Sequence, residues 1–247
     1  LHITDYALHF PTKGTSDYVN IWGMPSLTQF TVCLWVRTNA TTAGTPFSYA
    51  VPGQHNEIVI LGVRNPCIYI ASGSFSFEFQ YLHSPPPLVI LNELSLKRSV
   101  QFSSYSVIIS YSVTLPSTTD GKWHHVCLCW ENIAGSWKLY KDGAVAEQRS
   151  EQRDSFATGH VIKSGGSLML AQEQDSLGGD FDINQCFIGM LTNVNVWDHV
   201  PSPAEIEKMS KSCLSGEGNV CKWSDFIHGL KGETRVVIPS PCKPMAS

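Results

Sequence analysis

The acidic segment Ala171–Gln185, AQEQDSLGGDFDINQ, gathers the side chains of this protein that could do chemistry. Only 15% of the 247 residues are charged, yet this segment places four carboxylates around a Gly-Gly pair: Glu173, Asp175, Asp180 and Asp182. Carboxylates at this density bind a hard cation, act as a general acid and base, or form a solvated turn. The elements that position the segment decide among these three possibilities.

An enzymatic use of the segment would be the cleavage of a glycosidic bond. Retaining glycosidases on related sandwiches place Glu-x-Asp-x-x-Glu along one strand, with two carboxyl groups about 5 Å apart. Glu173-Gln174-Asp175 begins this pattern, but Gly178 stands where the third acid is needed. The sequence also contains no GxSxG, no HExxH and no Gly-rich phosphate loop. We therefore expect a non-catalytic protein, with a carbohydrate-active jelly-roll enzyme or lectin as the alternative.

A second pattern of potential metal ligands lies in the segment HHVCLCW, where His125, Cys127 and Cys129 alternate. Side chains two residues apart on a strand point to the same face. These three could form part of a soft-metal site, but the sequence offers no fourth ligand for zinc. The favoured interpretation is a central strand with one cysteine in a disulfide and the other side chains in the core.

The cysteines and one sequon indicate an extracellular protein. Eight cysteines are spread along the chain without CxxC pairs, as is typical of disulfides formed in an oxidising compartment: Cys33, Cys67, Cys127, Cys129, Cys186, Cys213, Cys221 and Cys242. Asn39 begins the N-glycosylation sequon Asn-Ala-Thr, and we expect a glycan there. A disulfide from Cys213 or Cys221 to Cys242 would pin the C-terminal segment to the domain.

Charge and hydropathy exclude two classes of partner. The net charge is −4 and no basic run or stripe is present, so nucleic acid is not an expected partner. No apolar run approaches the length of a membrane span, so we expect a membrane connection only through further parts of a longer chain. The first ten residues, LHITDYALHF, lack a basic region, so we expect the chain to begin after a removed signal.

The apolar pattern predicts short antiparallel strands. Val, Ile, Phe, Tyr and Trp are concentrated in runs bounded by turn residues: FTVCLWVR, EIVILGV, SFSFEFQYL, SVIISYSVTL, HHVCLCW, WKLYKDG, SLMLAQ and NVNVWD. Asp142-Gly143 is a strong signal for a hairpin with a type I′ turn. Without alternating helices, this pattern predicts an all-β fold, a two-sheet antiparallel jelly-roll sandwich.

One short α-helix is predicted near 203–211. Ser202 is a suitable N-cap, and Glu205 three residues later completes a capping box. Ile206 and Met209 then share one face of the helix, as the packing of a short helix against a sheet requires.

Several of these segments, taken in order, resemble the pentraxin family. HVCLCWEN keeps His125, Cys127 and Trp130 of the family signature His-x-Cys-x-Ser/Thr-Trp-x-Ser/Thr, and departs from it at Cys129 and Asn132. LAQEQDSLGGDFD looks like the family's calcium loop, and NVNVWDHVPSPAEI looks like the strand and helix that follow it. The resemblance covers roughly residues 1–80 and 105–240. It implies a jelly-roll sandwich with a disulfide between Cys33 and Cys127.

The resemblance also implies a calcium site. The implied ligands are Asn56, Glu173, the backbone carbonyl of Gln174, Asp175, Asp182 and Gln185. Calcium takes six to eight oxygens of these kinds. His55 stands where the family has an Asp, and an imidazole nitrogen is a poor calcium ligand. We therefore expect a weakened site that holds one Ca²⁺ ion or binds it weakly. Leu61 replaces an aromatic residue of the phosphocholine pocket, so phosphocholine is not an expected ligand.

The resemblance implies a single pentraxin-like domain over residues 1–242, followed by the start of a tether at 243–247. An insertion around 82–104 separates two predicted strands and contains the apolar run LVIL. This insertion is either an added hairpin packed on the sandwich or an edge or patch used in self-association.

Below the family level, the extra cysteines, the insertion and the Pro- and Ser-containing end are similar to the N-terminal pentraxin-like domain of an adhesion G-protein-coupled receptor. This similarity implies a non-catalytic extracellular module for recognition, adhesion and oligomerisation in the ectodomain of a plasma-membrane receptor. The expected partners are an extracellular-matrix or cell-surface ligand and a second copy of the chain, with a dimer as the favoured state.

Overall fold

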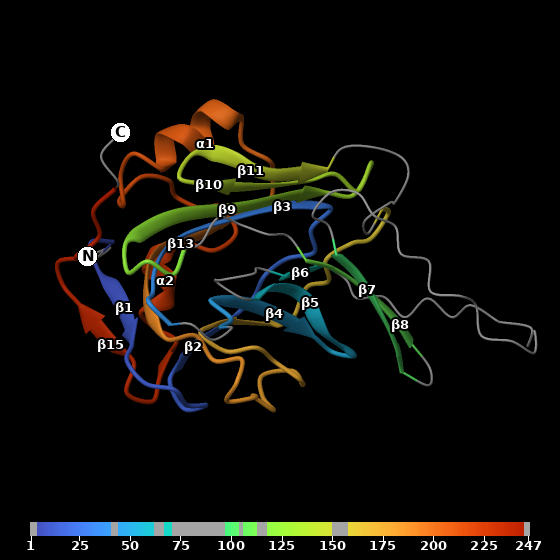
Figure 1. The fold of residues 1–247 in the computed structure, drawn as a ribbon, viewed down its shortest axis with the longest axis horizontal. Helices are drawn as coiled ribbons and strands as arrows, with labels where there is room; N and C mark the ends of the chain where they lie inside the picture. The colour runs from blue at the N-terminus through green and yellow to red at the C-terminus, as the bar shows by residue number, and fades with distance from the viewer. Residues whose placement is uncertain are drawn as a thin grey trace, which may run out of the picture.

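The computed structural model describes residues 4–40, 44–61, 67–70, 97–103, 106–112, 118–149 and 158–244. These residues form two facing β-sheets (Figure 1). The predicted strand SFSFEFQYL, the apolar run LVIL and most of the predicted insertion lie outside the described residues, as do the last three residues of the tether.

In the part of the chain that the structure describes, the first sheet has seven strands, all antiparallel to their neighbours. In order across the sheet they are β11 (Ala144–Arg149), β10 (Trp137–Lys141), β9 (Trp123–Glu131), β3 (Gln29–Arg37), β13 (Gly189–Trp197), β1 (Ala7–Phe10) and β15 (Arg235–Val237).

Among the described residues, the second sheet has eight strands, again antiparallel throughout. In order they are β14 (Leu230–Lys231), β2 (Tyr18–Trp22), β12 (Ser167–Leu170), β4 (Phe47–Val51), β5 (Gln54–Leu61), β6 (Cys67–Ile70), β8 (Ser106–Ser112) and β7 (Lys97–Ser103). The strand β7 is the part of the predicted insertion that the structure describes, and it pairs with β8 at the edge of this sheet.

The main core lies between the two sheets and follows the period of two in the sequence. On β3, Val32, Leu34 and Val36 belong to this core, whereas Cys33 and Trp35 belong to separate clusters on the outer face of the seven-stranded sheet. The predicted all-β sandwich is therefore confirmed, and the alternation of the sequence explains why it has two layers. The Asp142-Gly143 turn also forms as expected, with φ of 51° and 85°.

The predicted helix is α1 (Pro203–Met209), which packs on the outer face of the seven-stranded sheet (Figure 1). Ser202 and Glu205 form the capping box. The helix ends two residues earlier than predicted.

A second helix, α2 (Trp223–Phe226), was not predicted; its four residues are too few to show helical periodicity. Trp223 and Phe226 nevertheless join the main core. Neither described helix has the length and apolar character needed to cross a membrane.

Candidate functional site

The acidic segment forms the connection between β12 and β13, and it is tied to the neighbouring strand β4. The hydroxyl of Ser48 donates a hydrogen bond to the carbonyl of Gln172 (2.7 Å). At the other end of the segment, the N–H of Thr45 donates to the carbonyl of Gln185 (2.9 Å). Between these anchors, Ser176 and Gly179 exchange backbone hydrogen bonds, and Gly178 has a φ of 82°. A non-glycine residue rarely adopts this φ, so Gly178 allows the chain to fold back on itself.

The side chain of Gln174 holds the folded loop together from inside. It is fully buried, and its Nε2 donates to the hydroxyl of Ser48 and the carbonyl of Ser167, both at 3.0 Å. Its Oε1 accepts a hydrogen bond from the N–H of Gly178 (3.1 Å). Only the backbone carbonyl of Gln174 was predicted from the sequence to belong to the site. No sequence pattern signals this supporting role, because it depends on two strands that are distant in the sequence.

The carboxylate of Glu173 is the most unusual group in the loop. Glu173 is 3% exposed, and its Oε2 is buried without a hydrogen-bond partner among the described residues. Burial, followed by the negative charges of Asp175 and Asp182, raises the pKa of Glu173 to about 7, although the N–H of Gln174 acts in the opposite direction. Three of the predicted ligands, Glu173, Asp175 and Asp182, are therefore close enough to interact.

The other predicted ligands occupy different positions. Asn56 lies on β5, on the far side of β4 from β12, and its Oδ1 is buried without a hydrogen-bond donor among the described residues. The backbone N–H of Gln185 donates to the carbonyl of Asp182 (2.9 Å), which closes the second half of the loop. Asp180 and His55 are exposed.

These oxygens fit a hard divalent cation. A buried carboxylate oxygen without a donor is costly unless it gains a proton or a cation. A raised pKa corresponds to the first solution, and Ca²⁺ would provide the second, because it prefers carboxylate, amide and carbonyl oxygens. The unpartnered oxygen of Glu173, beside Asp175 and Asp182, is the observation that makes the loop a candidate metal centre.

An exposed tryptophan stands beside this loop. Trp22, at the end of β2, is 59% exposed, which is unusual for so large an apolar side chain. A Cβ placed on Gly178 would lie 3.7 Å from Cζ2 of Trp22, so the indole borders the turn of the acidic loop. Trp22 could not be predicted from the sequence, because its separation of more than 150 positions from Gly178 gives no sign of their contact.

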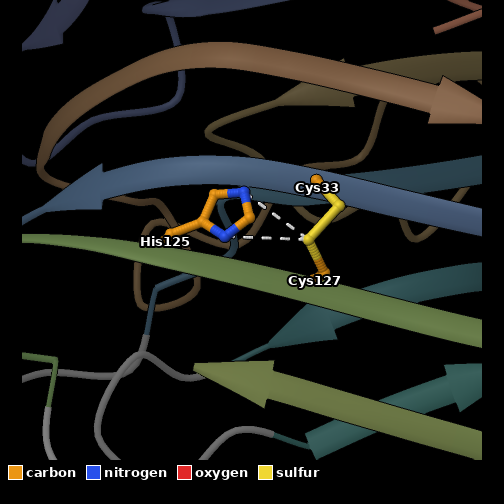
Figure 2. Close-up of side chains that lie close together, drawn as sticks. All are labelled: Cys33, His125 and Cys127. Carbon is orange, nitrogen blue, oxygen red and sulfur yellow. Dashed lines mark hydrogen bonds between the residues drawn. A yellow bond between two sulfur atoms is a disulfide. The ribbon is translucent and has the colours of Figure 1, made fainter. Parts of the chain in front are cut away.

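The second pattern of potential ligands forms a disulfide with a histidine packed beside it. Cys33 and Cys127 are joined by an S–S bond of 2.01 Å, and Nε2 of His125 lies 3.6 Å from Sγ of Cys127 (Figure 2). The potential ligand atoms of Cys33, His125 and Cys127 lie within 4.8 Å of one another, but the disulfide uses both thiols. Burial lowers the pKa of His125 to about 4, so the ring is neutral. Cys129 is a buried free thiol, and its burial raises the pKa of the thiol to about 11. The cluster is therefore part of the core rather than a metal site.

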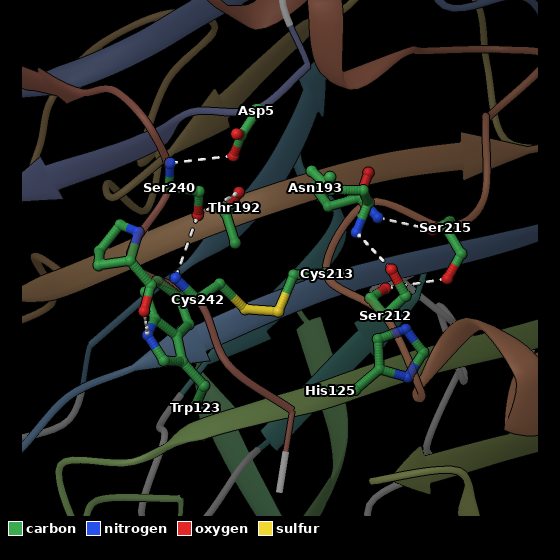
Figure 3. Close-up of a disulfide and its surroundings, with 12 residues drawn as sticks. Asp5, Trp123, His125, Thr192, Asn193, Ser212, Cys213, Ser215, Ser240 and Cys242 are labelled. Atoms are coloured by element: carbon green, nitrogen blue, oxygen red, sulfur yellow. Dashed lines mark hydrogen bonds between the residues drawn. A yellow bond between two sulfur atoms is a disulfide. The ribbon is translucent and has the colours of Figure 1, made fainter.

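A second disulfide joins Cys213 to Cys242, one of the two pairings considered from the sequence (Figure 3). Cys221 is instead a buried free thiol. Beside the disulfide, the C-terminal segment covers Trp123, whose Nε1 donates to the carbonyl of Pro241 (3.2 Å). The segment is thereby fixed to the outer face of the seven-stranded sheet.

Three further predicted positions lie away from these clusters: Asn39, Leu61 and Cys67. Asn39 is exposed just after β3, where a glycan is sterically possible, although Thr41 of its sequon lies outside the described residues. The side chains of Leu61 and Cys67 also lie outside them.

Relatives of the chain were identified by sequence. A profile described as the Pentaxin family matches residues 6–79 and 90–239. The chain is 36% identical over 203 residues to neuronal pentraxin-2 of Cavia porcellus, which covers 82% of this chain and 38% of that protein. It is 32% identical over 235 residues to the neuronal pentraxin receptor of Homo sapiens, which covers 93% of this chain and 39% of the receptor. The chain thus spans less than half the length of these curated relatives.

A solved structure supports the same assignment at the level of the fold. The native heptameric SAP-like pentraxin from Limulus polyphemus superposes with a TM-score of 0.67 at 22% sequence identity, covering 95% of this chain and 94% of that one. This similarity confirms the jelly-roll architecture predicted from the sequence. The family profile, which spans both sheets and the acidic loop, shows that the chain belongs to the pentraxin family.

Proposed function

We propose that this chain is a non-catalytic extracellular recognition and adhesion module whose acidic loop binds Ca²⁺. The observation that carries the proposal is the buried, unpartnered Oε2 of Glu173 beside Asp175 and Asp182. Pentraxins generally bind calcium. The absence of the expected Asp at position 55 weakens the site, so the affinity should resemble that of extracellular modules, with a Kd of about 10⁻⁴–10⁻³ M.

A glycosidase mechanism is less well supported by the geometry. The third acid of the expected triplet is replaced by Gly178, which forms the turn between Ser176 and Gly179. The chain therefore turns where the enzyme motif requires a continuous strand.

We further propose that the domain belongs to the ectodomain of a plasma-membrane receptor of the adhesion G-protein-coupled type. Two disulfides fit an oxidising compartment, and Asn39 of the sequon is exposed. One of the relatives is itself named a receptor. The Cys213–Cys242 disulfide, which fixes the C-terminal segment, would suit a domain whose chain continues into a longer protein under tension.

The ligand surface that we propose combines the acidic loop with Trp22. An exposed indole next to a cation site offers an apolar face for a sugar ring or a protein side chain. Leu177, which is 39% exposed at the tip of the turn, extends this apolar surface. The expected ligand is a matrix or cell-surface molecule, and a lectin function is compatible with the same surface.

Self-association is the last part of the proposal. The Limulus relative is a heptamer by its description, whereas we favour a dimer for this chain. The strand β7, at the edge of the eight-stranded sheet, has no neighbour on its outer side among the described residues. Such an edge is suited to pairing with a second copy.

Calorimetric titration with calcium after chelation tests the loop. We expect heat uptake or release and a rise in melting temperature at millimolar calcium. Both should be lost in Glu173→Gln and kept in Asp180→Asn, which removes an exposed carboxylate of the same loop. Absence of heat and of a melting shift in the wild type would contradict calcium binding.

Binding of the purified domain to immobilised matrix proteins, glycans and cell surfaces, with and without calcium, tests recognition. We expect a calcium-dependent ligand whose binding falls in Trp22→Ala but not in Ile133→Ala, a matched exposed apolar residue that is 88% exposed on a different loop. Equal binding by the two variants would exclude Trp22 from the ligand surface.

A further inference from the structure

A row of basic residues crosses the outer face of the seven-stranded sheet. Strand pairing sets Arg235 opposite His9, His9 opposite Met190, and Met190 opposite Arg37. Directly paired residues share one face of a sheet. That face is the outer one, because the preceding or following residues, Leu8, Val36 and Leu191, belong to the core between the sheets. The row therefore runs perpendicular to β15, β1, β13 and β3, over about 14 Å between the first and last strands.

The part of this row on β1, β13 and β3 borders a pocket. A pocket of about 300 Å³ is lined by residues that include His9, Arg37, Thr38, Asn39, Gly121 and Met190. Nε of Arg37 donates to the carbonyl of Gly121 (2.9 Å), which fixes the stem of the guanidinium group at the rim. Arg37 and Arg235 are exposed, and His9 is partly exposed. The side chains of the row are thus accessible to a ligand.

The positive charge of the row is not balanced within the described part of the chain. None of the three basic side chains has an ion pair with a described carboxylate. Asp120 precedes Gly121 in the chain, but its carboxylate already accepts from His124 (3.0 Å) and from the N–H of Lys122 (2.9 Å).

The pKa of His9 is consistent with the same excess of positive charge. Burial, followed by the charges of Arg235 and Arg37, lowers the pKa of His9. Both guanidinium groups are therefore close enough to act on the ring, from opposite sides along the row. A ligand with negative charge would relieve this repulsion.

We propose that the row formed by Arg235, His9 and Arg37 binds an extended polyanionic glycan, a chain with repeated sulfate or carboxylate groups. Arginine is suited to both groups, because its planar fork forms paired hydrogen bonds with them. Two exposed arginines at the ends of a straight row, with a histidine between them that can gain a proton, match a chain with repeated anions better than a single small anion. This site shares no residue with the acidic loop, so only its extracellular setting rests on the proposed function.

The test measures binding of a sulfated heparin-type oligosaccharide in the presence of a calcium chelator, at 50 and 200 mM salt. We expect affinity to fall with salt and to fall about tenfold or more in Arg37→Gln and in Arg235→Gln. Lys163→Gln, which removes the same charge from an exposed residue outside the row, should bind like the wild type. Because Asn39 lines the pocket, each variant is also measured with Asn39→Gln, which prevents a glycan from covering the site.

Three outcomes would overturn the proposal. They are absence of oligosaccharide binding at 50 mM salt, equal losses in the arginine and Lys163 variants, and binding of inorganic sulfate as tight as that of the oligosaccharide. Unchanged melting temperatures would show that the variants are folded. As an independent readout, nuclear magnetic resonance titration of His9 should show its pKa rising when the oligosaccharide binds. Since the chelator removes calcium throughout, a failure of the acidic loop to bind calcium leaves this test unaffected.

Discussion

At the scale of single residues, the raised pKa of Glu173 links the stability of the protein to pH. Its folded pKa of about 7 lies above the ordinary value of 4.5, so the folded state holds this proton more tightly. The stabilisation is complete below pH 4.5 and is lost as the pH rises from there through about 7. Without calcium, we expect the free energy of unfolding to fall by up to about 3 kcal/mol over this window.

The variant Glu173→Gln should remove this loss, because a neutral amide has no charge to bury. In chelator at pH 8 it should be more stable than the wild type, and calcium should not stabilise it further. Urea denaturation between pH 4.5 and 8 measures the effect. Asp180→Asn serves as the control, since Asp180 is not among the charges that act on Glu173. The φ of 55° at this position suits an asparagine as well as an aspartate, so the substitution should not strain the backbone. A pH dependence that survives in Glu173→Gln would contradict the assignment.

His124 gives a second, separable pH dependence. Its Nδ1 lies 2.8 Å from a carboxylate oxygen of Asp142 and its Nε2 lies 3.0 Å from one of Asp120. Burial lowers the pKa of His124, but the hydrogen bonds to Asp142 and Asp120 outweigh this effect and leave the pKa raised. The stabilisation is therefore present below the ordinary value of 6.5 and is lost as the pH rises above it.

We expect His124→Gln to be less stable than the wild type at pH 6 by about 1–3 kcal/mol, with a smaller difference at pH 9. Urea denaturation at both pH values, in the Glu173→Gln background, isolates this contribution. His199→Gln is the control, because His199 is exposed and pairs with the equally exposed Asp198. A difference that does not shrink between pH 6 and pH 9 would show that His124 contributes by packing alone.

At the scale of elements, the Cys213–Cys242 disulfide fixes the C-terminal segment over the sheet. The backbone of Ser240 also donates to Asp5 (3.0 Å), so the two ends of the domain are joined next to the disulfide (Figure 3). The cysteines are 29 residues apart in sequence, and closing a loop of that length stabilises a fold by about 3–4 kcal/mol. The hydrogen bond between Ser240 and Asp5 connects the segment just before β1 with the segment that follows β15.

Replacing both cysteines by serine should lower the free energy of unfolding by about 3–4 kcal/mol and expose the indole of Trp123. Thermal unfolding and tryptophan fluorescence measure the two effects. Each single variant should be at least as unstable as the double variant, because a lone thiol provides no cross-link. A double variant with wild-type stability would show that hydrogen bonds and packing hold the segment without the disulfide.

The elements that could be predicted from the sequence are those with local signals. The alternation in β3, the Asp142-Gly143 turn and the capping box of α1 each depend on a few adjacent residues. The helix α2 was missed because four residues carry too little periodicity. In the loop, the carboxylates were visible in the sequence, whereas the support of Gln174 and the position of Trp22 arise only when distant strands meet. The basic row was invisible for the same reason, since its members are separated by up to 226 positions.

At the scale of the whole molecule, the free edges of the two sheets are the surfaces on which a second copy of the chain could add strands. The eight-stranded sheet ends in β7, whose outer edge carries backbone groups without a neighbour among the described residues. We expect the protein to dimerise by pairing two such edges, independently of calcium, because the acidic loop contributes nothing to β7. Its solution mass should therefore be twice that of one chain, both with calcium and with chelator.

Proline substitutions in β7 test this arrangement. The backbone N–H groups of consecutive residues in an antiparallel strand point to opposite edges of the strand. Val100 and Gln101 are consecutive residues of β7, and proline has no N–H group. Of the two variants Val100→Pro and Gln101→Pro, one therefore removes a donor from the free edge and the other removes a donor that faces β8. The variant that affects the free edge should be monomeric at wild-type stability, whereas its neighbour should be destabilised by loss of a ladder hydrogen bond. Light scattering and urea denaturation distinguish the two. A dimer that persists in both variants, or one that forms only with calcium, would place the interface elsewhere, and in the second case at the acidic loop.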